Sequence, residues 1–170
     1  MKSKTIVSVL IIVLGIGGLF WWGRLAQKSS STNSGQNSNL SANVLQAMET
    51  SYDFGKISMA QGLVEKTFEI SNTTTQDVSL ERITTSCMCT VAYLETAGGG
   101  EKGPFGMIGH GGSVPNVDEI IKAGETRKVR VVFDPNAHGP AGIGIINRVV
   151  MLEDNAGEKL EFRIKAVVTP

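Results

Sequence analysis

Alternation of apolar and polar residues is the main pattern in the chain from Val44 onward. Nearly every second residue is apolar over three stretches, namely residues 64–71, 128–133 and 160–168. A period of two is what a β-strand with one buried face requires. The pattern therefore predicts a strand in each stretch, with Phe68, Phe133 and Phe162 pointing into a core. Lys66 is an exception in the apolar series of the first strand.

The alternation changes phase once, between Leu80 and Ile83 in the strand-like stretch 78–85. One extra residue in a strand moves every following side chain to the other face of the sheet. We therefore expect a β-bulge near Glu81 or Arg82.

Turn-forming residues separate these stretches, at residues 72–77, 123–125, 134–136 and 154–157. The same part of the chain has no convincing amphipathic helix. Short strands divided by such turns are typical of a β-sandwich. The sequence therefore predicts one all-β domain over residues 44–170, with a longer glycine-rich insertion at residues 95–118.

The N-terminal region has a different composition. Residues 5–23 carry no charge, and a helix needs about 20 apolar residues to cross a bilayer. Trp21 and Trp22 end this run, where aromatic side chains meet a membrane interface. A cleaved signal peptide is the competing interpretation, but Phe20 to Arg24 replaces the small residues of a cleavage site. We interpret residues 1–28 as a short cytoplasmic stub and a single transmembrane anchor at about residues 5–23.

Residues 29–43 are almost entirely Ser, Asn, Thr, Gln and Gly. A segment with so little apolar surface cannot offset its ordering entropy, so we expect a flexible tether. Basic residues flank the anchor on both sides, but the short N-terminal flank cannot hold a domain. The folded domain is therefore expected outside the cytoplasm, attached to the cell membrane.

Charge is segregated along the chain. Four of the 16 basic residues precede all 16 acidic ones, namely Lys2, Lys4, Arg24 and Lys28. The remainder of the chain thus has a net charge of −4. Because binding to phosphate backbones needs a basic face, we expect no nucleic-acid partner.

Several motifs occur in a familiar order: Phe54-Gly55, Phe68–Asn72, Ser86–Thr90, Ala123–Glu125 and Val132–Pro135. The chain resembles, over roughly residues 46–168, a bacterial immunoglobulin-like family of unknown function with a Ser-Cys-Gly-Cys-Thr motif. That family is similar to the ASH and major-sperm-protein-like domains of Hydin and abnormal-spindle proteins. The resemblance implies an immunoglobulin-like β-sandwich and export, without an activity. Met88 in place of the motif's glycine, and the insertion at 95–118, depart from the family pattern.

Cys87 and Cys89 are the two cysteines of the chain. In an extended strand, residues two apart have Cα atoms about 6.6 Å apart, near the upper limit for a disulfide. A bridge here would also close a very short loop, so it would stabilise the fold little. A redox-active disulfide is therefore one interpretation of the pair.

A soft-metal site is the second interpretation. Two thiolates suit Cu(I) or Zn(II), and Met107 and His110 lie in the glycine-rich segment downstream. We expect a metal site, if present, to use Cys87, Cys89, Met107 and His110. His138 and Met88 rank behind these, since His138 lies in a turn-rich segment where a solvated histidine is common. Simple packing of both cysteines as small apolar side chains is the third interpretation.

No catalytic residue is expected, because no Ser or Cys lies in a nucleophile-elbow context and the chain has only two histidines. The sequence favours a bacterial cell-envelope domain that binds or scaffolds another envelope protein. The alternative is a module that handles copper, zinc or redox equivalents through the Cys-x-Cys pair.

Overall fold

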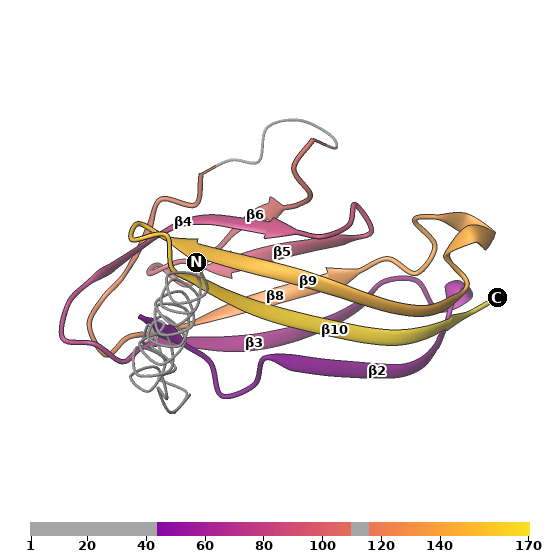
Figure 1. Ribbon diagram of the computed structural model, residues 1–170, viewed down its shortest axis with the longest axis horizontal. Coiled ribbons are helices and arrows are strands. Elements are labelled where there is room, and N and C mark those ends of the chain that lie inside the picture. The colour runs from indigo at the N-terminus through magenta and orange to yellow at the C-terminus, as the bar shows by residue number, and fades with distance from the viewer. Residues whose placement is uncertain (1–43, 110–115) are drawn as a thin grey trace, which may run out of the picture. The chain divides into compact units, whose positions relative to one another are not determined.

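The computed structural model describes residues 44–109 and 116–170 (Figure 1). The predicted anchor at 5–23 with Trp21 and Trp22, the tether at 29–43 and the candidate ligand His110 lie outside the described residues. Within the described ranges, no helix is long and apolar enough to cross a membrane.

The strands of the described residues form two five-stranded sheets. The first sheet has the order β1 (Leu45–Gln46), β3 (Val64–Asn72), β8 (Thr126–Phe133), β5 (Thr90–Glu95) and β6 (Glu101–Phe105). The second sheet has the order β2 (Ser51–Ser58), β10 (Lys159–Thr169), β9 (Gly144–Asp154), β4 (Val78–Thr85) and β7 (Glu119–Ile121). Two short 3-10 helices, η2 (Met59–Gln61) and η3 (Gly139–Gly142), complete the described elements. The predicted all-β fold is confirmed.

Strand pairing is antiparallel except at one edge. In Figure 1, β9 and β10 run side by side, paired from Lys159 with Glu153 to Val168 with Gly144. The exception is β2, which pairs with β10 in parallel, Arg163 lying opposite Ser51. Of the predicted turn segments, residues 154–157 join the antiparallel neighbours β9 and β10. The other three, at residues 72–77, 123–125 and 134–136, lie where the chain passes from one sheet to the other.

One hydrophobic core lies between the two sheets. Phe68 of β3 and Phe162 of β10 stack on each other, with ring centroids 4.3 Å apart and planes 8° from parallel. These two side chains are 1% and 0% exposed, and Phe133 is also buried. The predicted inward orientation of all three phenylalanines is confirmed. The contact between Phe68 and Phe162 joins the two sheets face to face as a β-sandwich.

The two irregularities predicted in the strands have clear structural causes. The register between β4 and β9 shifts between Leu80 and Arg82, which confirms the β-bulge. Lys66 departs from its apolar series because its ammonium group pairs with Glu49 at 2.6 Å and lies 4.4 Å from the ring centroid of Tyr52. Its long apolar stem can thus cover core side chains while the charge is paired.

The segment at 95–118 is more regular than a glycine-rich insertion suggests. Residues 101–105 form β6, which pairs with β5, and Phe105 is buried in the core. Gly103 makes this pairing possible, because a Cβ atom there would lie 2.8 Å from the Ala92 carbonyl oxygen. The sequence did not predict a strand within this glycine-rich insertion, and β6 forms because pairing with β5 compensates for its low strand propensity.

Asn72 is a buried polar residue at the end of β3. Its side-chain amide donates to the carbonyls of Gln76 and Ile121 at 2.7 and 2.9 Å, and its side-chain oxygen accepts from the Thr74 N–H at 3.0 Å. We expect Asn72→Ala to lower the free energy of unfolding by roughly 3 kcal/mol, because it leaves buried groups unpaired. Chemical denaturation should measure the loss. Asn155→Ala in an exposed turn is the control, and equal effects of both changes would contradict the prediction.

Candidate functional site

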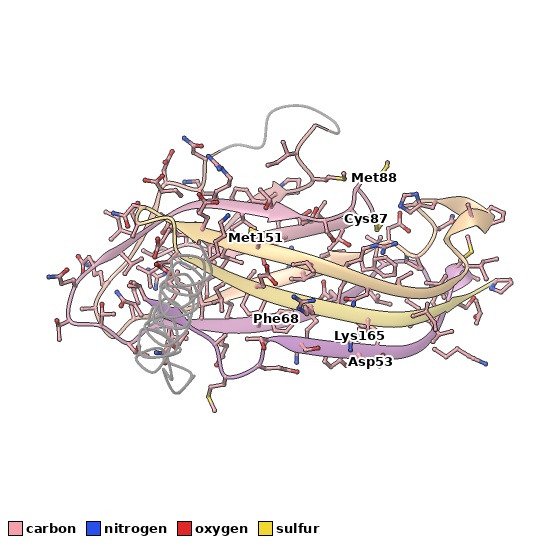
Figure 2. The ribbon with its side chains drawn as sticks, in the orientation of Figure 1. Asp53, Phe68, Cys87, Met88, Met151 and Lys165 are labelled. Atoms are coloured by element: carbon pink, nitrogen blue, oxygen red, sulfur yellow. A yellow bond between two sulfur atoms is a disulfide. The ribbon has the colours of Figure 1, made fainter. Side chains whose placement is uncertain are left out.

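The two cysteines lie in the tight turn that joins β4 to β5, where Figure 2 shows Cys87 next to Met88. The Thr90 N–H donates to the Cys87 carbonyl at 3.1 Å, which closes the turn. The buried Thr85 hydroxyl lies 3.0 Å from the Cys87 carbonyl and 2.9 Å from the Thr90 carbonyl. Threonines on both sides of the motif therefore hold the turn in one shape.

Cys87 and Cys89 are joined by a disulfide in this turn. Their Cα atoms are 5.3 Å apart, less than the 6.6 Å expected for an extended strand. The assumption of an extended strand was wrong, because β4 ends at Thr85 and the chain turns before β5 begins at Thr90. The two sulfur atoms also differ in environment, since Cys89 is only 3% exposed whereas Cys87 is half-buried.

His138 approaches Cys87 from the connection between β8 and β9. Its Nε2 atom lies 3.2 Å from the Cys87 Sγ atom. The connection is anchored where it leaves β8, because the Asp134 N–H donates to the Cys89 carbonyl at 2.9 Å. Gly142 packs closely against the histidine, since a Cβ atom there would lie 3.3 Å from the Cβ atom of His138. A backbone bond within the loop, from the Gly139 N–H to the Asn136 carbonyl at 2.9 Å, also spans the position of this exposed histidine.

Arg148 approaches Cys89 from strand β9. Its Nε atom donates to the Cys89 Sγ atom at 3.3 Å, and one terminal nitrogen donates to the Asn147 carbonyl at 3.1 Å. Arg148 lies in phase with the buried residues Ile146 and Val150, so it extends from the inner face of β9. Among the described arginines, it alone has no carboxylate within ion-pair distance. Its positive charge is thus directed at a sulfur atom.

The sequence did not single out Arg148. A signal was present, because β9 carries a charged residue at a position whose strand neighbours of the same phase are Ile146, Val150 and Leu152. A charge in that series needs a partner, since burying an unpaired charge is costly. Arginine is not a metal ligand, so the soft-ligand pattern of Cys, Met and His did not point to it.

The structure brings three of the predicted candidate metal ligands together. Potential ligand atoms of Cys87, Cys89 and His138 all lie within 4.8 Å of one another. Among the described residues, His138 is thus a histidine at the cysteine pair, whereas His110, which the sequence ranked ahead of it, lies outside them. Met107 follows Gly106, whose carbonyl accepts from the Thr85 N–H at 3.2 Å, so this methionine lies close to the end of β4. Met88 is 52% exposed.

Carboxylates do not take part in this cluster. The pKa of Glu101 is lowered by a hydrogen bond from Arg130, and the pKa of Glu125 is lowered by one from Arg127. Both shifts have an arginine partner as their main cause, which is typical of structural ion pairs at a sheet surface. The chemistry available at the turn is therefore that of sulfur, imidazole and guanidinium.

Comparison with known proteins gives a family match and a fold. Residues 45–106, which include the Cys-x-Cys turn, match a family described as "Protein of unknown function (DUF1573)". This agrees with the resemblance to a family of unknown function. No curated protein is significantly similar to the chain in sequence.

Solved structures with the same fold include a protein of unknown function from Porphyromonas gingivalis W83. It is 17% identical with a TM-score of 0.53, and the match covers 73% of this chain and 46% of that protein. The VesB protease of Vibrio cholerae is 13% identical with a TM-score of 0.48, over 74% of this chain and 32% of the protease. A family 123 glycoside hydrolase from Clostridium perfringens is 10% identical with a TM-score of 0.48. The match covers 71% of this chain and 23% of the hydrolase. The similarity to the Porphyromonas gingivalis protein supports the fold and nothing further. No conclusion is drawn from the other two structures.

Proposed function

We propose that residues 44–170 form a thiol–disulfide redox module outside the cytoplasm, held at the cell membrane by the predicted anchor at 5–23. The observation that carries the proposal is the asymmetric environment of the disulfide. Cys87 is half-buried beside His138, whereas Cys89 is buried beside Arg148. This is the alternative function that the sequence left open.

A structural role explains this disulfide poorly. The bridge joins residues two apart in sequence, so it removes little entropy from the unfolded chain. The turn is already held by the hydrogen bonds of Thr85 and Thr90. A cross-link that adds little stability but has a histidine and an arginine at its two sulfurs is better suited to exchange.

Reduction would begin at the more accessible sulfur. A thiolate of the partner attacks the Cys87 Sγ atom, forms a mixed disulfide with it and breaks the bond to Cys89. Cys89 leaves as a thiolate, and the adjacent guanidinium of Arg148 stabilises its negative charge. A better-stabilised leaving thiolate makes the exchange faster. Arg148 thus has a role that a hydrophobic residue of similar size would not fill.

The second step releases the partner. Its second thiolate attacks the partner's own sulfur in the mixed disulfide, so the partner becomes a disulfide and Cys87 leaves as a thiolate. His138 Nε2 and the Cys89 N–H, which lie 3.2 and 3.4 Å from the Cys87 Sγ atom, can hydrogen-bond this thiolate. The domain has then gained two electrons as a dithiol, and the partner dithiol has lost two.

The full-length chain in detergent provides the test. We expect it to show a reversible two-electron transition when it is equilibrated with glutathione buffers of different potential. Alkylation and mass spectrometry measure the fraction of reduced Cys87 and Cys89. A pair that is reduced only when the domain unfolds, or that does not reoxidise, would contradict the proposal.

Arg148→Gln is expected to shift this equilibrium toward the disulfide by roughly tenfold. The reason is that the reduced form loses a hydrogen bond from a charged donor, which contributes about 1.5 kcal/mol. Arg163→Gln is the matched control, because Arg163 lies on the neighbouring β10 and pairs with Glu161 at 2.9 Å. Equal shifts in both variants would mean that the effect is one of overall charge.

Binding or scaffolding of an envelope protein is the second candidate function. It is favoured by an apolar pair on the outer face of the second sheet, where Ile145 and Val167 lie opposite each other and are 87% and 41% exposed. An immunoglobulin-like sandwich similar to ASH and major-sperm-protein-like domains is part of this proposal. A pure scaffold should tolerate Cys87→Ser with Cys89→Ser, whereas a redox module should not.

A further inference from the structure

We propose that the reduced site binds one Cu(I) ion through the Sγ atoms of Cys87 and Cys89 and the Nε2 atom of His138. The inference rests on the proposed function because the two sulfurs must first be released from their disulfide. The binding step itself transfers no electrons, since two thiolates and an imidazole nitrogen donate lone pairs to the ion. Any protons on these ligands pass to solvent.

The positions of the three donor atoms suit a single small ion. Soft-metal bonds of about 2.3 Å to sulfur and about 2.0 Å to nitrogen place donor atoms roughly 3.5–4 Å apart around one ion. The three donor atoms already lie within 4.8 Å of one another, and Nε2 of His138 is 3.2 Å from the Cys87 sulfur. Breaking the disulfide lets the sulfurs separate while the Cα atoms stay 5.3 Å apart. Small rotations of the side chains therefore complete the site.

The ligand set favours Cu(I) over Zn(II). Thiolate sulfur is a soft donor, which suits Cu(I), whereas structural Zn(II) sites take four protein ligands. Among the described Cys, His, Asp and Glu residues, the cluster of Cys87, Cys89 and His138 provides three ligands.

Arg148 adds a charge argument for a monovalent ion. Two thiolates and Cu(I) carry a net charge of −1, which the guanidinium beside the Cys89 sulfur neutralises. The same ligands with Zn(II) are neutral, so Arg148 would leave a net charge of +1 beside a buried sulfur. Uncompensated charge in a buried site is unfavourable. Arg148 therefore selects for a monovalent soft cation without being a ligand itself.

The test uses the full-length chain in detergent, reduced and kept free of oxygen. The number of free thiols is counted first, and Cu(I) is then titrated in competition with a chromophoric Cu(I) chelator. We expect two free thiols and one equivalent of bound Cu(I). If two thiols are present but Cu(I) does not bind, the metal inference is wrong while the redox function stands. If the folded chain yields no thiols, both proposals are wrong.

Three variants test the assigned roles. His138→Ala should weaken Cu(I) binding by at least roughly tenfold, since even residues outside the ligand shell contribute this much. Arg148→Met should lower the preference for Cu(I) over Zn(II), with Arg163→Met as the control. The chain with Cys87→Ser and Cys89→Ser should not bind at all. Binding that survives this double change, or that His138→Ala leaves intact, would overturn the assigned ligand set.

Discussion

Phe162→Ala is expected to lower the free energy of unfolding by about 3–5 kcal/mol, the usual cost of removing a buried phenylalanine ring. Phe162 is 0% exposed, and its ring stacks on that of Phe68 with centroids 4.3 Å apart. The two residues belong to different sheets, so a cavity at this position weakens the contact between the layers. Loss of the aromatic pair adds about 0.5–1.5 kcal/mol to the loss of buried area.

Chemical denaturation followed by far-UV circular dichroism measures this effect, since the signal comes from the strands. Val167→Ala is the control on the same strand, because its side chain points to the outer face and is 41% exposed. Its effect should stay near or below about 0.5 kcal/mol, as for most surface substitutions. A loss below about 1 kcal/mol for Phe162→Ala would mean that the two sheets do not share one core.

The strands that the sequence predicted are those with one fully buried face. In β10, Leu160, Phe162, Ile164 and Ala166 are all buried, and the intervening residues are not. In such a strand, apolar residues that face the core alternate with polar residues that face solvent, so the sequence shows a period of two. The bulge in β4 was predictable for the same reason, because it changes the phase of the pattern.

Edge strands were harder to predict because pairing, and not side-chain burial, defines them. β2 contains Gly55 and has one fully buried residue, Ile57, so its alternation is weak. Its parallel pairing with β10 depends on where the chain returns in space, and local sequence does not encode this. β6 contains Gly103 and Pro104, which disfavour strands, yet it pairs with β5.

In the candidate site, too, some residues could be predicted from the sequence and others could not. Cys87 and Cys89 could be found from sequence because they are soft side chains at a fixed spacing. The nearness of His138 to the pair could not be predicted, because its position depends on β8 pairing with β5, which brings Asp134 to the Cys89 carbonyl. Proximity in sequence favoured the segment that holds His110, whereas His138 reaches the Cys87 sulfur from 51 residues away.

The two cysteines should differ strongly in reactivity when each is the only one left. We expect Cys87, in the Cys89→Ser variant, to react with a small aromatic disulfide roughly tenfold or more faster than Cys89 in the Cys87→Ser variant. The same Cys→Ser change makes each variant, so the two matched chains differ only in which sulfur remains. Stopped-flow absorbance of the released aromatic thiolate gives both rates.

Two effects of opposite sign decide this ratio. Arg148 favours the thiolate of Cys89, but an ordinary thiol is already a few per cent ionised at pH 7, so full ionisation raises the thiolate fraction by roughly 30-fold at most. The accompanying fall in nucleophilicity cancels part of that gain. Burial acts more strongly, since Cys89 is 3% exposed and an opening that costs about 3–4 kcal/mol slows attack by roughly 100- to 1,000-fold. Equal rates, or a faster Cys89, would show that the turn does not keep this sulfur buried, and Cys87 would then lose its role as the sulfur that a partner attacks.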